Sequence, residues 1–187
     1  MSKRLRILCD VDGVLADFVG LVLDYVQKNT GLSYLPSAVD QWDCFACLGL
    51  KEHWPYFRTQ VDELGLCRTM REIPGAREFY AELRRLTGEG GKVRVCTTPM
   101  TTAWLTQRAE WLVEFGVPLN EQIQWCDKHE LVPAYDILID DKAENCESFV
   151  RAGGVAWCIA TPYNTHLPEH MPRGSHAQCL EWLRELA

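Results

Sequence analysis

The 187-residue chain lacks several features that would place it in whole classes of protein. No stretch approaches the roughly 18 consecutive apolar residues of a membrane-spanning helix, so we predict no membrane segment. The 19 Lys and Arg residues are outnumbered by 26 Asp and Glu, giving a net charge of −7. Stable binding to nucleic acid needs a surplus of cationic side chains facing the phosphates, so we predict no stable binding to nucleic acid. No Gly/Ser-rich linker and no repeat divides the chain, which favours one core with an insertion over two independent domains.

A second Cys-x-x-Cys pair is also missing. Cys44 and Cys47 form a single pair that with Cys67 or His53 could hold zinc, but an unsupported pair is by default structural. The nine cysteines are an odd count, and several lie in apolar strand-like runs, as buried thiols in a reducing compartment do. The N-terminal sequence enters such a run without a cleavable hydrophobic segment. Together these features predict a cytoplasmic protein.

Strand-like and helix-like segments alternate along the chain, which is typical of α/β domains. Apolar runs predict strands at residues 5–10, 92–97, 122–126, 135–140 and 154–160. Apolar residues at helical spacing predict helices at about 15–29, 74–86, 101–115 and 144–152, with a last helix after Ser175. This order predicts a Rossmann-like, doubly wound parallel sheet with helices on both faces.

The segment between Gly31 and Ile73 breaks the alternation. It is rich in aromatic residues and contains no convincing strand. We therefore predict a small, mostly helical cap inserted after the first strand and helix. The approximate boundaries are 1–30 and 72–187 for the α/β core and 31–71 for the cap.

The first strand-like run ends in two aspartates, Asp10 and Asp12, followed by Gly13. Residues two apart in a strand point the same way, so both carboxylates can face one small volume. Two like charges so close are costly unless a cation, a proton or a substrate compensates, and Mg²⁺ is the usual partner of carboxylate oxygens. The alternative is a solvated turn, because Asp and Gly are common there.

Polar residues also follow the other predicted strands. In parallel α/β sheets ligands bind at the carboxyl ends of the strands, so these residues are expected to meet at one edge. Each pair is a weak signal alone, since Thr-Thr commonly caps a helix and an isolated Lys is usually solvated. Three such pairs occur at successive strand ends: Thr97 and Thr98, Asp127 and Lys128, and Asp140 and Asp141. Together they supply hydroxyl groups for an anion, one cation, and carboxylates for a metal ion.

The four motifs DVDGVLADF, CTTP, CDKH and LIDDK resemble those of the haloacid-dehalogenase-like phosphatases. More narrowly, the ADF continuation, the IPGA segment at 73–76 and the spacing of the later motifs are similar to the cytosolic and mitochondrial 5′(3′)-deoxyribonucleotidases. The resemblance spans the whole core. It implies a phosphoric monoester hydrolase that works through a phospho-aspartate intermediate, with Asp10 as nucleophile and Asp12 as general acid and base.

The same resemblance implies a Mg²⁺ cofactor. Its ligands would be Asp10, the backbone carbonyl of Asp12 and the Asp140/Asp141 pair, with the inner ligand of that pair left open. A phosphate dianion is repelled by these carboxylates, so the site must supply positive charge and donors. Lys128 would provide charge beside the metal. Thr97 and Thr98 would donate hydroxyl groups to the phosphoryl oxygens.

Substrate choice is expected to lie with the cap. In the nucleotidase family the Phe of the ADF sequence, here Phe18, faces the base, and cap aromatics complete a stacking slot, for which we expect Trp42, Phe45 and Trp54. Simple packing on a helix face is the alternative for Phe18. Where relatives carry aromatics ahead of the Pro-Gly-Ala segment, this chain has Leu66 and Cys67, which puts the preference for deoxy pyrimidine nucleotides in doubt.

These residues and the resemblance are compatible with three functions. The first is a Mg²⁺-dependent 5′(3′)-nucleotidase that hydrolyses (deoxy)nucleoside monophosphates to nucleoside and phosphate. The second is another small-molecule phosphatase of the superfamily, acting on a sugar or metabolite phosphate, which Arg58, Arg68 or His53 in the pocket would favour. The third is a non-catalytic protein that binds a phosphorylated ligand. Relatives are often dimers, so the resemblance also implies a homodimer.

Overall fold

A six-stranded sheet forms the centre of the computed structural model, which describes residues 5–88 and 90–186. Every pair of neighbouring strands is parallel, in the order β3-β2-β1-β4-β5-β6. The strands are β1 Arg6–Cys9, β2 Lys92–Thr97, β3 Gln122–Gln124, β4 Ile137–Asp140, β5 Val155–Ile159 and β6 Arg173–Gly174. The predicted α/β fold with a doubly wound parallel sheet is confirmed.

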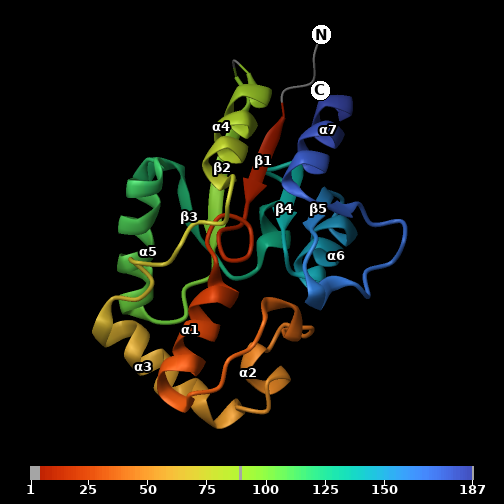
Figure 1. Ribbon diagram of the computed structural model, residues 1–187. Coiled ribbons are helices and arrows are strands. Elements are labelled where there is room, and N and C mark those ends of the chain that lie inside the picture. The colour runs from red at the N-terminus through yellow and green to blue at the C-terminus, as the bar shows by residue number, and fades with distance from the viewer. Residues whose placement is uncertain (1–4, 89, 187) are drawn as a thin grey trace.

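Helices connect the strands and cover both faces of the sheet (Figure 1). Alternate strand residues point to opposite faces, so Ile137 and Ile139 of β4 join a cluster with α4 and α7, whereas Leu138 packs with Phe149 of α6. The helices are α1 Phe18–Thr30, α2 Cys44–Cys47, α3 Trp54–Leu64, α4 Ala76–Thr87, α5 Thr102–Phe115, α6 Ala143–Arg151 and α7 His176–Leu186. Short 3₁₀ turns lie at Pro36–Ala38, Lys51–His53, Leu119–Glu121, Lys128–Leu131 and Pro162–Asn164.

Helix α1 begins at Phe18, three residues later than the predicted start near 15, so that part of the prediction is wrong. Residues 11–16 instead form a tight turn in which the Val11 carbonyl accepts from the backbone N–H groups of Leu15 and Ala16, at 2.7 and 2.8 Å. The Asp17 side chain then caps α1 by accepting from the N–H of Gly20. The apolar spacing that predicted an earlier start belongs to this buried turn.

Residues 31–71 carry α2 and α3 and no strand. In Figure 1, α1, α2 and α3 lie beyond the ends at which the strand arrows point. Helix α1 and residues 31–71 together form one stretch that begins and ends at the same place, since Asp17 N–H donates to the Arg71 carbonyl at 2.8 Å and Ile73 N–H to the Leu15 carbonyl at 2.9 Å. Within the described residues no helix is long and apolar enough to cross a bilayer.

Helix α5 joins the core to this segment. The Thr101 hydroxyl accepts from the N–H of Trp104 as the cap of α5, and donates to the Asp62 carboxylate of α3 at 2.5 Å. The buried Gln107 donates to the Asp62 carbonyl and accepts from Cys67 N–H, both at 3.2 Å. These contacts fix α3 against α5 on one side of the volume enclosed between the sheet and the insert.

Candidate active site

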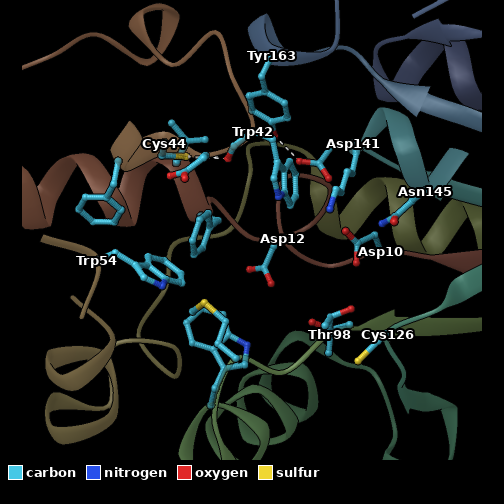
Figure 2. A pocket seen from close by; sticks show the side chains of 18 of the residues that line it. Asp10, Asp12, Trp42, Cys44, Trp54, Thr98, Cys126, Asp141, Asn145 and Tyr163 are labelled. Carbon is cyan, nitrogen blue, oxygen red and sulfur yellow. Dashed lines mark hydrogen bonds between the residues drawn. The ribbon is translucent and has the colours of Figure 1, made fainter. Parts of the chain in front are cut away.

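A cavity of about 670 Å³ lies between the carboxyl ends of the strands and residues 31–71, a size suited to a small-molecule ligand. Of the residues expected at this edge of the sheet, all but Asp127 and Asp140 line it. Figure 2 shows Asp10, Asp12 and Asp141 on the core side of the cavity and Trp54 facing them from the insert. The predicted residues that line the cavity are Asp10, Asp12, Phe18, Trp42, Phe45, Trp54, Thr97, Thr98, Lys128 and Asp141.

The acidic centre follows directly from strand pairing. Cys9 of β1 lies opposite Ile139 of β4, which places Asp10 and Asp140, the next residues, side by side. Carboxylate oxygens from Asp10, Asp140 and Asp141 all lie within 4.8 Å of one another. Three buried carboxylates so close are stable only with compensating cations or protons.

Lys128 supplies one such charge. Its Nζ lies 2.6 Å from Asp10 Oδ1 and 2.6 Å from Asp140 Oδ2, and the residue is 3% exposed. Although burial lowers the pKa of Lys128, the two carboxylates raise it well above its ordinary value, so the amine stays charged. Lys128, which also lines the cavity, therefore neutralises part of the acidic centre.

Asp140 has both oxygens engaged. Oδ1 accepts from the backbone N–H of Lys142 at 2.8 Å, and Oδ2 accepts from Lys128 and from Asn145 Nδ2 at 3.0 Å. Asp141 differs, because Tyr163 donates to its Oδ2 while its buried Oδ1 has no hydrogen-bond partner among the described residues. A buried carboxylate oxygen without a donor is suited to a hard cation such as Mg²⁺, so the donor set fits that ion.

Burial also controls protonation in this centre. It raises the pKa of Asp10 to about 7, although the ammonium of Lys128 lowers it. Burial and the nearby charge of Asp140 raise the pKa of Asp141 well above its ordinary value. Without a metal ion, these groups accordingly hold protons at a pH where ordinary carboxyl groups have lost them.

The loop after β1 lies against the same centre. Gly13 has φ 77°, and a Cβ atom built there would stand 1.7 Å from Asp141 Oδ2. Only glycine satisfies both the left-handed backbone and this close approach. The glycine of the Asp-x-Asp-Gly sequence thus allows the loop that carries Asp10 and Asp12 to lie against Asp141.

Asp12 points into the cavity in Figure 2 and pairs behind with Arg108 of α5, a residue that is 0% exposed. Burial raises the pKa of Asp12, and the guanidinium of Arg108 partly offsets that rise. Two hydroxyls complete the core side. That of Thr97 is buried and has no hydrogen-bond partner within the described chain, and that of Thr98 donates to the Trp125 carbonyl at 3.2 Å.

Aromatic side chains line the opposite side of the cavity. Phe18 is half-buried, lines the cavity and makes edge contacts with Phe57 and Trp104 at centroid distances of 6.2 and 6.1 Å. It therefore both packs on its helix face and faces the cavity. The ring centroids of Phe45 and Trp54 lie 5.9 Å apart. Trp42 lines the cavity and is 45% exposed.

Trp42 is held by residues of the core. Its ring lies 5.7 Å from that of Tyr163, and the ammonium of Lys142 lies over its face at 4.8 Å from the centroid. The polar candidates of the insert do not line the cavity. Arg58 donates to the Met100 carbonyl, Arg68 pairs with Glu110 outside it, and His53 is likewise absent from the lining.

Several residues of the site were not predicted. They are Arg108, Lys142, Asn145 and Tyr163. For Arg108 a signal was present, because an arginine at helical spacing from Trp104 and Trp111 lies on an apolar face. The zinc alternative finds no support, since the groups of metal-ligating side chains within the described residues include the Asp10, Asp140, Asp141 cluster and none with Cys44 or Cys47.

Comparisons with solved structures identify the fold. A haloacid-dehalogenase-like hydrolase from Streptococcus pneumoniae is 14% identical with a TM-score of 0.64, covering 95% of this chain and 97% of that one. A hydrolase from Pseudomonas syringae is 16% identical with a TM-score of 0.62, covering 98% and 99%. A haloacid-dehalogenase family hydrolase from Deinococcus radiodurans, with bound phosphate and sodium, is 16% identical with a TM-score of 0.55, covering 97% and 95%. The fold is that of the haloacid-dehalogenase-like hydrolases.

The family follows from the sequence match. The model of the family described as 5′ nucleotidase, deoxy (pyrimidine), cytosolic type C protein matches residues 3–183, and the chain belongs to that family. No curated protein matches the chain. The resemblance stated from the motifs is thereby confirmed, as is the prediction of a phosphatase-type enzyme.

Proposed function

We propose that the protein is a Mg²⁺-dependent 5′(3′)-nucleotidase that hydrolyses (deoxy)nucleoside monophosphates to nucleoside and phosphate. The observation that carries this proposal is one cavity with a buried carboxylate cluster on one side and aromatic rings on the other. A phosphate ester suits the first side and a flat base the second. Membership of a nucleotidase family supports the same substrate class.

The first chemical step forms a bond between a carboxylate oxygen of Asp10 and phosphorus. As the ester P–O bond breaks, Asp12 gives its proton to the leaving oxygen and the nucleoside departs. Asp12, now a carboxylate, takes a proton from water while the water oxygen attacks phosphorus. This second step releases inorganic phosphate and restores Asp10.

Positive charge and donors must stand around the phosphoryl group before attack. We assign these roles to the buried Lys128 and to the hydroxyls of Thr97 and Thr98. Mg²⁺ held by Asp10, the Asp12 carbonyl and Asp141 would add charge that offsets the repulsion between substrate and carboxylates. The free Oδ1 of Asp141 supports Asp141 over Asp140 as the inner ligand.

Residues 31–71 are proposed as the cap, with residues 1–30 and 72–187 as the core. Phe18, Trp42, Phe45 and Trp54 would hold the base, each contact contributing about 1–3 kcal/mol. Arg58, Arg68 and His53 lie outside the lining, and the insert contributes the rings of Trp42, Phe45 and Trp54 beside the charged Asp43 and Lys51. The three rings favour the nucleotidase over the second candidate. The resemblance also predicts a homodimer, which sedimentation velocity would test.

The test is phosphate release from ribo- and deoxyribonucleoside 5′- and 3′-monophosphates and from sugar phosphates, with and without Mg²⁺. We expect preferential turnover of nucleotides, abolished by EDTA and by Asp10→Asn. A phosphorylated Asp10 trapped by rapid acid quench would establish the intermediate. Turnover of sugar phosphates alone would overturn the substrate assignment, and turnover retained in Asp10→Asn would overturn the mechanism.

A further inference from the structure

Arg108 is a buried charge that does not reach the cavity. It lies on α5 between Trp104 and Trp111, with its guanidinium carbon 5.0 and 5.3 Å from their ring centroids. It is 0% exposed and absent from the cavity lining. Burying a guanidinium costs free energy unless an anion pairs with it. The anion that pairs with Arg108 therefore indicates the role of this residue.

That partner is Asp12. Arg108 Nη2 donates to Asp12 Oδ1, and this is the one ion pair that the described residues give the arginine. A weak contact to Met70 Sδ at 3.8 Å uses the same nitrogen, while Nε and Nη1 have no partner within the described chain. Its aromatic neighbours and its single anion therefore direct the guanidinium at one oxygen of Asp12.

We propose that Arg108 is a positioning residue: by engaging Oδ1 of Asp12 it presents Oδ2 of the same carboxyl group to the oxygen that leaves, and later enters, at phosphorus. This inference rests on the acid–base role assigned to Asp12 under the proposed function. Arg108 does not touch the substrate and acts through Asp12 alone. The two tryptophans supply the stiffness, because they leave the guanidinium little room to follow a rotating carboxyl group.

The step that depends on this geometry is proton transfer to the leaving oxygen. The Asp10 oxygen–phosphorus bond forms, the ester P–O bond breaks with its electron pair on oxygen, and the proton of Asp12 Oδ2 moves to that oxygen. A basic leaving group needs this proton in the transition state, whereas p-nitrophenolate leaves readily without it. Loss of Arg108 should therefore slow P–O cleavage in proportion to the basicity of the leaving group.

The experiment compares Arg108→Gln with the parent enzyme on phenyl phosphate and p-nitrophenyl phosphate in Mg²⁺. The phenol released in the first turnover is measured, so that P–O cleavage is read apart from the later hydrolysis. We expect a loss of about 10-fold or more on phenyl phosphate and of less than about 3-fold on p-nitrophenyl phosphate. Asp12→Asn should show the same selectivity, and the double variant should lose no more than Asp12→Asn alone.

Arg77→Gln is the matched control. Arg77 also lies against an aromatic ring, that of Phe115 at 5.1 Å, and also pairs with a carboxylate, Glu72, but it stands away from the cavity. Its variant should keep both rates. Thermal unfolding confirms that each variant is folded, and Arg108→Lys, which retains the charge, replaces Arg108→Gln if the latter does not fold.

Equal losses on both substrates in a folded variant would overturn the proposal, because a merely structural role slows all substrates alike. Additive losses in the double variant would do the same, as would an Asp12→Asn enzyme with no dependence on the leaving group. Both test substrates lack a nucleoside. An enzyme that cleaves them but no nucleotide therefore contradicts the proposed substrate and leaves the positioning role supported.

Discussion

At the scale of single residues, the site depends on charges that are buried before any substrate arrives. Lys128 is held by Asp10 and Asp140 at 2.6 Å each, and Arg108 by Asp12. Each cation thus matches a carboxylate to which the proposal gives a role in catalysis or its support. Fixed cations cost no reorganisation during reaction, which is the condition for strong electrostatic stabilisation of a transition state.

Gly13 gives a prediction at this scale. Gly13→Ala should destabilise the fold and abolish phosphatase activity, because the new Cβ would overlap Asp141 Oδ2. Gly31→Ala is the control, since Gly31 has nearly the same φ, 76°, but nothing within 4 Å of its Cβ position. We expect Gly31→Ala to cost only the backbone strain, about 1–2 kcal/mol in urea unfolding, with activity kept. Equal losses in both variants would count against the clash with Asp141.

Some residues of the site could be predicted from the sequence and others could not. Asp10, Asp140 and Asp141 were identified from their places at strand ends, because neighbouring parallel strands bring such residues to one edge. Arg108 and Tyr163 were missed. Both reach the site from elements whose orientation depends on tertiary packing, and an arginine or tyrosine in a helical pattern usually has no such partner.

At the scale of elements, strands were predicted more closely than the loops between them. β2 has the predicted bounds, 92–97, because Val93 and Val95 alternate with the half-buried Lys92 and Arg94, and this alternation is typical of a strand. The start of α1 was predicted three residues early. The apolar residues Val14, Leu15 and Ala16 are buried in a turn, and burial alone does not distinguish a turn from a helix.

The contact between α3 and α5 can be tested through Thr101. Thr101→Val removes both the cap of α5 and the hydrogen bond to Asp62, so we expect a loss of about 1–2 kcal/mol in urea unfolding. Asp62→Ala should lose less, because it leaves the cap. In a double-mutant cycle the two changes should couple by about 0.5–1.5 kcal/mol. Thr102→Ala, at an exposed neighbouring position, is the control; a coupling of zero would show that the contact does not join the helices.

At the scale of the whole molecule, the acidic centre should make stability depend on pH in an unusual direction. The pKa of Asp10 is raised to about 7, and those of Asp12 and Asp141 are also raised. Between about pH 4, the ordinary pKa of an aspartate, and pH 7, the folded state binds protons that the unfolded state has released. Stability from these groups is therefore full below about pH 4 and is lost as pH rises toward 7.

Thermal unfolding in EDTA across this range checks the prediction: the melting temperature should fall as pH rises from about 5 to 7. Saturating Mg²⁺ should flatten or reverse the slope, since the ion binds the deprotonated carboxylates and only the folded state gathers them. Asp141→Asn, which removes one of the acids, should weaken both effects. A melting temperature that rises with pH in EDTA would contradict the proton-holding centre.

Helix α1 and residues 31–71 form a stretch whose two ends meet, and this has a consequence for how such a protein can change in evolution. Asp17 bonds to Arg71 and Ile73 to Leu15, so the chain returns to the point it left. A loop whose ends already touch adds little closure entropy when its length changes. The stretch between these bonds, which holds α1 as well as residues 31–71, can be exchanged or extended while β1 and the loop after it stay in place. Recognition of the leaving group and cleavage of the phosphate ester are thereby encoded in largely separate stretches of chain, free to evolve at different rates.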